Sequence, residues 1–169
     1  IGDVTLLQNE QKIKADRLEY VKDSKSKAVS YRAIGNVEII DSIRTAICGI
    51  ASYDAKNEEI ILNHKPRITN EDRIIKGDQI KLNYTDDVLE RIFIPKNAFI
   101  TSASVGYNQL NIDSSNTLIS FEDRMSSKVL NGFFVNGSLD SLRLIGMAST
   151  TYHLFEDSLY KGKNLTSGD

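Results

Sequence analysis

The sequence predicts an all-β protein whose antiparallel strands form two facing sheets. Apolar and polar residues alternate within short segments, as Ile80, Leu82 and Tyr84 do within residues 79–84, and a period of two is typical of a strand with one buried face. A strand–turn–strand unit returns about every 30 residues, the period of stacked supersecondary units. No segment combines a helix cap with a convincing helical period, so we expect little helix.

The repeated unit is a strand ending in tyrosine, a polar turn, a second apolar strand, and a turn that is small or contains proline. Its tyrosines are Tyr20, Tyr53 and Tyr84. Stacked units of this kind bury their apolar faces only against one another. The repeat therefore predicts a long apolar groove or tube rather than a compact catalytic pocket.

The remaining elements follow from the same patterns. Strands are predicted in the segments 15–20, 35–39, 45–50, 60–62, 79–84, 92–94, 133–135 and 142–145. Polar turns separate them, and Asn136-Gly137 is the strongest hairpin signal. Residues 106–120 are rich in Asn and Ser, which predicts a long loop or an insertion. Residues 120–130 also admit one short helical turn.

The composition bounds the function classes. The chain has 169 residues, with 21 Lys and Arg against 23 Asp and Glu, which leaves no basic footprint for nucleic acid. No apolar run approaches the roughly 20 residues of a membrane span. The chain starts and ends abruptly, and Ser167-Gly168-Asp169 repeats the start of an earlier unit. We expect one domain over 1–169, cut from a longer repeat protein.

No catalytic or metal-binding constellation is present in the sequence. Cys48 lies in a predicted strand and is expected to be a packed small residue rather than a reactive thiol. His64 and His153 have no further ligands at metal-binding spacing. The acidic pairs at 58–59 and 86–87 point to opposite faces of a strand or lie in solvated turns. We therefore expect a protein that is not an enzyme and needs no metal or cofactor.

Four short motifs carry a family resemblance. Gly35-Asn36-Val37-Glu38-Ile39, the run 76–84 with Lys-Gly-Asp at its start, residues 89–92, and Gly146-Met147-Ala148-Ser149 resemble the OstA-like repeat of LptA and of the N-terminal part of LptD. The resemblance extends from Ala15 to Asp169. The sequence departs from the family pattern in the loop at 106–120. It departs again at residues 65–67, where Lys-Pro-Arg replaces a Gly-Asn pair.

The resemblance implies a β-jellyroll, a twisted and open stack of antiparallel strands. It implies a module of lipopolysaccharide transport in a Gram-negative periplasm, associated with the outer membrane, that holds the lipid A acyl chains between its sheets. The expected partners are lipopolysaccharide and other Lpt bridge proteins, or further copies of the chain. Protein partners would join head to tail through edge strands.

The candidate lipid contacts are apolar residues of the predicted strands. Such residues form the core of any β-protein, and only the resemblance makes some of them lipid contacts. These candidates are Ile80, Leu82, Tyr84, Ile92, Ile94, Phe99, Leu142 and Leu144. Arg73 and Lys76 are the candidates for the rim where a charged head group would lie, although a solvated strand face would also account for them.

Two other hypotheses remain open from the residues themselves. The chain could be a structural β-repeat used for scaffolding or adhesion, with no lipid ligand. It could also be a parallel β-helix that acts on polysaccharide, but the hairpin signals favour antiparallel pairing.

Overall fold

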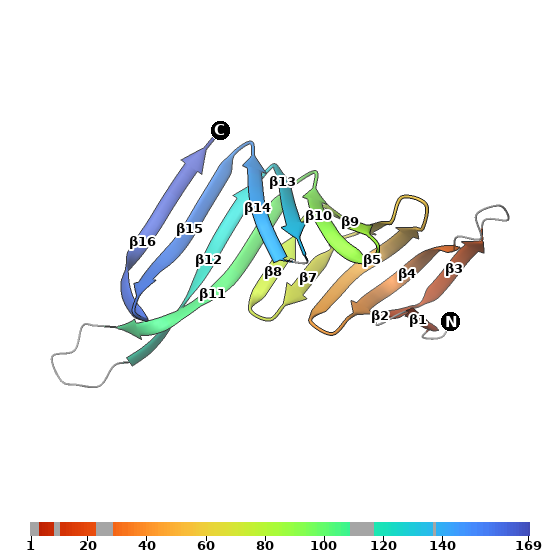
Figure 1. The fold of residues 1–169 in the computed structure, drawn as a ribbon, viewed down its shortest axis with the longest axis horizontal. Helices are drawn as coiled ribbons and strands as arrows, with labels where there is room; N and C mark the ends of the chain where they lie inside the picture. Colours follow the sequence, from red (N-terminus) through yellow and green to blue (C-terminus); the bar gives the residue numbers. More distant parts are fainter. Residues whose placement is uncertain (1–3, 9–10, 23–28, 109–116, 137) are drawn as a thin grey trace.

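The computed structural model describes residues 4–8, 11–22, 29–108, 117–136 and 138–169 (Figure 1). These residues form sixteen strands and no helix, so none of the described chain is a helix that could cross a membrane. The all-β prediction is confirmed. The strands are β1 (Val4–Gln8), β2 (Gln11–Ala15), β3 (Arg17–Lys22), β4 (Val29–Ile40), β5 (Arg44–Asp54), β6 (Glu59–Asn63), β7 (Arg67–Asn70), β8 (Arg73–Lys76), β9 (Gln79–Thr85), β10 (Val88–Ile94), β11 (Ala98–Asn108), β12 (Thr117–Ser127), β13 (Val129–Val135), β14 (Ser138–Ile145), β15 (Ala148–Glu156) and β16 (Leu159–Gly168).

Successive hairpins alternate between two layers of one continuous sheet. One layer contains β2, β7, β8, β11, β12, β15 and β16, and the other contains β3, β6, β9, β10, β13 and β14. β4 and β5 belong to both layers: residues 29–34 of β4 pair with β3, and residues 38–40 pair with β2. The molecule is elongated, with its two ends far apart (Figure 1). This is the jellyroll arrangement that the sequence predicts.

The corners between layers explain two of the family motifs. Gly35 and Asn36 adopt positive φ angles of 77° and 45°, a region that glycine and asparagine tolerate best. The Asn36 side chain donates to both carboxylate oxygens of Asp16, at 3.2 and 3.0 Å. At another corner, Asn97 donates to both oxygens of Asp78, at 3.1 and 3.0 Å. The Gly-Asn and Lys-Gly-Asp motifs therefore build matching halves of the turn that carries the chain from one layer to the other.

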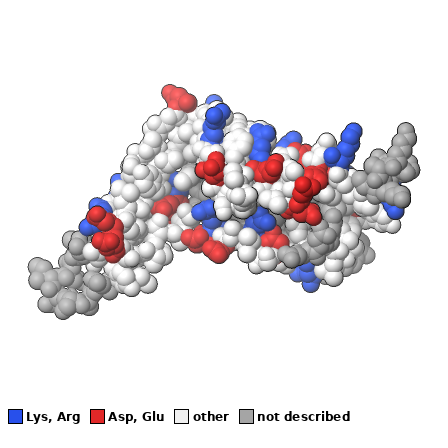
Figure 2. Space-filling model, in the orientation of Figure 1, with Lys and Arg blue, Asp and Glu red and all other residues white. Residues whose placement is uncertain are grey.

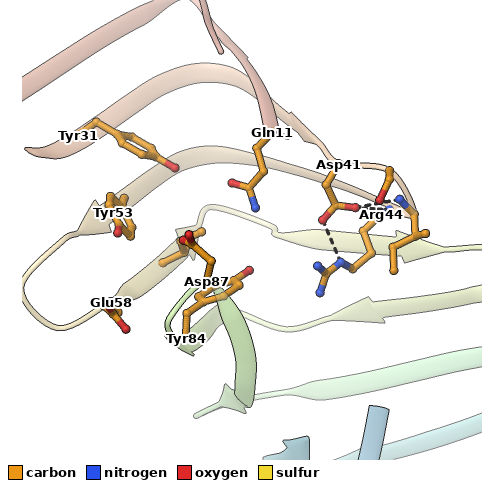
Figure 3. A pocket seen from close by; sticks show the side chains of 11 residues that line it. Gln11, Tyr31, Asp41, Arg44, Tyr53, Glu58, Tyr84 and Asp87 are labelled. Atoms are coloured by element: carbon orange, nitrogen blue, oxygen red, sulfur yellow. Dashed lines mark hydrogen bonds and ion pairs between the residues drawn. The ribbon is translucent and has the colours of Figure 1, made fainter. Parts of the chain in front are cut away.

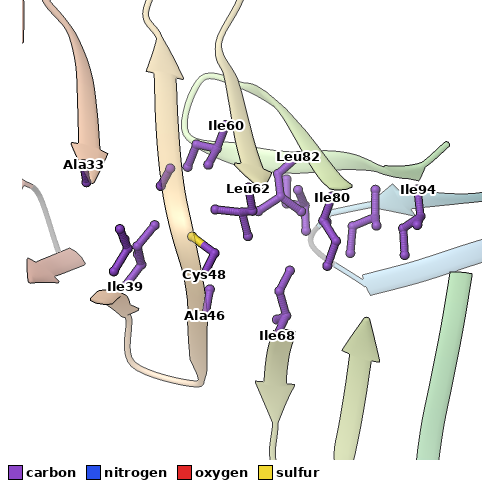
Figure 4. Close-up of a cluster of buried hydrophobic side chains, with 14 of the residues drawn as sticks. Ala33, Ile39, Ala46, Cys48, Ile60, Leu62, Ile68, Ile80, Leu82 and Ile94 are labelled. Carbon is purple, nitrogen blue, oxygen red and sulfur yellow. The ribbon is translucent and has the colours of Figure 1, made fainter. Parts of the chain in front are cut away.

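The core lies between the two layers and is made by the inward residues of each strand (Figure 4). Alternation is plain in β6, where Ile60 and Leu62 are buried while their neighbours are half-buried. Cys48 is buried with a free thiol, as predicted, and burial raises its pKa to about 11. The side chains of Ile80 and Ile94 are 0% exposed. This part of the sandwich is closed.

Two expectations about the second half of the chain need correction. The predicted loop at 106–120 is shorter, because Gly106–Asn108 and residues 117–120 are paired strand in the β11–β12 hairpin; residues 109–116 lie outside the described residues. The helical turn at 120–130 is wrong. Residues 117–127 form β12, where less exposed residues such as Phe121 alternate with exposed ones such as Glu122, and that period of two favours a strand. β13 and β14 pair as the predicted hairpin, although Gly137 of its turn lies outside the described residues.

The β11–β12 and β15–β16 hairpins close on one another at their far ends. The Tyr107 N–H donates to the Ser158 carbonyl at 2.7 Å. Beside this contact, the rings of Phe121 and His153 stack with centroids 4.3 Å apart. The His153 Nδ1 atom lies 2.8 Å from the Asp123 carboxylate. These strands thus have a small aromatic and polar core of their own.

Candidate functional site

A groove runs between the two layers where they separate. Two adjoining cavities of about 130 and 120 Å³ form it, and they share Arg73, Ile75, Ile92 and Phe134 in their walls. One layer contributes β2, β7, β8, β11 and β12, the other contributes β6, β9, β10, β13 and β14, and the shared strands β4 and β5 contribute as well. We call this space the inter-sheet groove. Its walls are mainly aliphatic, which suits an apolar ligand.

The groove continues into a larger and more polar space toward the N-terminal strands. This polar cavity has a volume of about 360 Å³. It shares six wall residues with the adjoining part of the groove: Gln11, Asp41, Ile43, Arg44, Ile60 and Tyr84. The sandwich therefore contains one continuous path, apolar along most of its length and polar at one end.

Five of the predicted site residues lie along this path. Leu82, Tyr84 and Ile92 line the groove from β9 and β10, Leu142 lines it from β14, and Arg73 lies in the wall shared by its two cavities. Residues that are 60 or more positions apart in the sequence are thus brought to one surface by the alternation of hairpins between layers.

The other predicted residues lie elsewhere. Ile80 and Ile94 are sealed in the core and line neither cavity of the groove. Phe99 is on the opposite face of β11 from the buried Ala98 and Ile100. Leu144 is partly buried and packs against the core cluster. Lys76 is an exposed residue at the end of β8.

Several groove residues were not predicted from the sequence. Phe134 lies in the wall common to both cavities, and Met125, Leu130 and Leu139 line the cavity at the C-terminal side. The period of two places Leu130 on an inward face. It places Gly132 and Phe134 on the same face, because the residue left over by the register shift between Phe133 and Phe134 is Asp140, in the partner strand β14.

Few charged residues line the groove, and most of them already have a partner within the protein. Arg73 is exposed in β8, while Arg44 is paired with Asp41 at 3.0 Å. Asp123 is held by hydrogen bonds from Ser104 and from the backbone and ring of His153. Burial would raise the pKa of Asp123, but these hydrogen bonds outweigh it and hold the pKa below its usual value. Arg73 is thus the groove cation best placed to meet an anionic group at the opening.

The described residues contain no cluster of three or more His, Cys, Asp or Glu side chains that could hold a metal ion. On the face shown in Figure 2, acidic and basic residues are interspersed, with no extended basic patch. The site is therefore best described by its shape and apolar walls.

Comparison with known proteins identifies one family. The sequence model of the family described as LptA/(LptD N-terminal domain) LPS transport protein matches residues 1–88. These residues contain β1 to β9, and among these are β4 and β5, the strands shared by the two layers. Searches of curated proteins and of solved structures found no match.

Proposed function

The chain belongs to the family of LptA and the LptD N-terminal domain, whose members are lipopolysaccharide transport proteins. From that premise we propose that it is a non-enzymatic carrier module. In this proposal, the inter-sheet groove holds the acyl chains of lipopolysaccharide. The observation that supports this most directly is the continuity of the groove across strands from both layers. A compact core would need no such space, since protein interiors leave few voids larger than a water molecule.

The energetics of the groove favour an acyl chain. Each methylene moved from water to an apolar wall contributes about 0.8 kcal/mol, and the walls offered by Ile75, Ile92 and Phe134 are continuous between the two cavities. The phosphates of the head group would remain at the opening beside Arg73, because burying unpaired charge is far more costly than leaving it in water. Lys76, at the other end of the same strand, lies further along the exposed surface.

The ends of the sheet suggest how such modules would join. At one end of the described chain, β14 pairs only with β13, and at the other, β3 pairs only with β4. Unpaired edges recruit strands of other chains. We propose that the edges pair head to tail with another Lpt bridge protein or with a second copy, in the periplasm of a Gram-negative cell.

Site-specific photo-crosslinking tests the groove. A crosslinker at Phe134, in the wall of both cavities, should capture lipopolysaccharide in cells. The matched control is Phe133, the same residue type on the opposite face, which is 42% exposed. It lies near the Arg91 guanidinium, 5.7 Å from the ring centroid, and should capture little. Leu82 against Lys81 provides a second pair on β9.

The crosslinking result also distinguishes a lipid carrier from a structural scaffold. A structural β-repeat without a lipid ligand predicts no lipid adduct at Phe134 or Leu82 in a folded protein. Equal labelling of Phe134 and Phe133 would show surface contact only, and either result would refute the carrier function.

A further inference from the structure

The polar cavity at the N-terminal end of the groove has a chemistry that acyl chains do not require. Tyr31, Tyr53 and Tyr84 project into it from β4, β5 and β9 (Figure 3). The rings of Tyr31 and Tyr53 lie 5.3 Å apart between centroids, tilted by 31°. Its volume of about 360 Å³ is within the roughly 300–1,000 Å³ typical of small-ligand sites.

One tyrosine is built into this wall without a partner of its own. Tyr31 is only 5% exposed and lines the cavity, and its hydroxyl points toward the open space in Figure 3. Among the described residues, no group is hydrogen-bonded to that hydroxyl. The hydroxyl is open to the cavity rather than sealed in the core, so a ligand can bind it without displacing a protein partner. Burial raises the pKa of Tyr31, Tyr53 and Tyr84, so each keeps its proton and can donate.

The charges around the cavity limit the ligand. Asp41, Glu58 and Asp87 contribute three carboxylates, and Arg44 contributes the single guanidinium, which is already paired with Asp41. Carboxylates accept hydrogen bonds but cannot donate them, and they repel anions. A phosphate, which is an acceptor and carries negative charge, is therefore excluded.

A hydroxyl-rich ring meets all of these conditions. Each sugar hydroxyl can donate to a carboxylate and accept from a guanidinium or phenol, while tyrosine rings provide an apolar surface with a polar tip. We infer that the polar cavity is a binding site for an unphosphorylated sugar ring. This site is separate from the groove beside Arg73, where the proposed carrier function places phosphates. It would serve a sugar of the transported glycolipid or a free glycan equally.

The test uses lipid-free, dephosphorylated oligosaccharide released from lipopolysaccharide, titrated into the whole chain by isothermal calorimetry. Tyr31→Phe removes only the unpartnered hydroxyl and keeps the ring. Asp87→Asn removes the carboxylate charge, and asparagine tolerates the φ of 64° that the backbone adopts at this turn. Each variant should weaken binding about tenfold, as expected for the loss of one hydrogen bond in a polar site. Tyr20→Phe is the control, because Tyr20 is 72% exposed on β3.

Three results would overturn the inference: no binding of the oligosaccharide to the unmodified chain, binding that neither variant changes, or inorganic phosphate competing for the same site. Because the probe has no acyl chain, these results are independent of crosslinking at Phe134. A parallel titration with intact lipopolysaccharide distinguishes the sources. If Tyr31→Phe weakens that binding too, the sugar belongs to the cargo, whereas an effect on the oligosaccharide alone identifies a free glycan as the ligand.

Discussion

Truncation of Ile94 should destabilise the protein much more than truncation of Leu142, although the sequence presents both as inward residues of apolar strands. Ile94 is 0% exposed in the closed core, whereas Leu142 is part of the groove wall. Ile94→Ala removes three buried carbons, a loss of about 2.4 kcal/mol at about 0.8 kcal/mol each. The cavity left behind raises the cost to about 3–4 kcal/mol. Leu142→Ala enlarges an existing space and should cost about 1 kcal/mol.

Urea unfolding measures the free energy of unfolding of both variants. Far-UV circular dichroism is a better probe of this unfolding than fluorescence, because the chain contains no tryptophan. At about 2–4 °C per kcal/mol for a chain of this size, Ile94→Ala should lower the melting temperature by about 6–16 °C. Leu142→Ala should instead reduce capture of lipopolysaccharide at Phe134 while the fold persists. Equal costs at the two positions, or a cost below about 1 kcal/mol at Ile94, would refute the division between core and groove.

Two further predictions concern the C-terminal strands and the sheet edges. Because the folded-state pKa of Asp123 is depressed, its contribution to stability is present above the unfolded value of about 3.9 and is lost as pH falls through the folded pKa. Asp123→Asn should therefore cost about 1–3 kcal/mol near neutral pH and flatten the acid limb of the stability curve, unlike the exposed Asp140→Asn. The unpaired edges of β14 and β3 predict that sedimentation rates rise with protein concentration, and a monomer at every concentration would contradict edge pairing.

Much of the fold follows from local patterns in the sequence. The period of two around Ile80 and Leu82 identifies strands, and the repeat predicts that they stack. The Gly-Asn and Lys-Gly-Asp motifs at Asn36 and Asp78 are local signals too, because the positive φ angles and the Asn–Asp hydrogen bonds of the corners demand those residue types. The loop at 106–120 was predicted too long, since strand pairing to β11 extends a segment whose composition alone indicates a loop.

The site depended on tertiary structure for a physical reason. Alternation along a strand says which face is buried, but not whether the opposing layer is in contact there or has separated. Ile94 and Leu142 therefore look alike in sequence, and only the pairing of distant strands makes one core and the other groove wall. The meeting of Tyr31 with Asp87 in one cavity also arises from packing between remote hairpins. By itself, the sequence determined the family, the all-β class and the corners; the course of the groove and the polar cavity were decided where the two layers part.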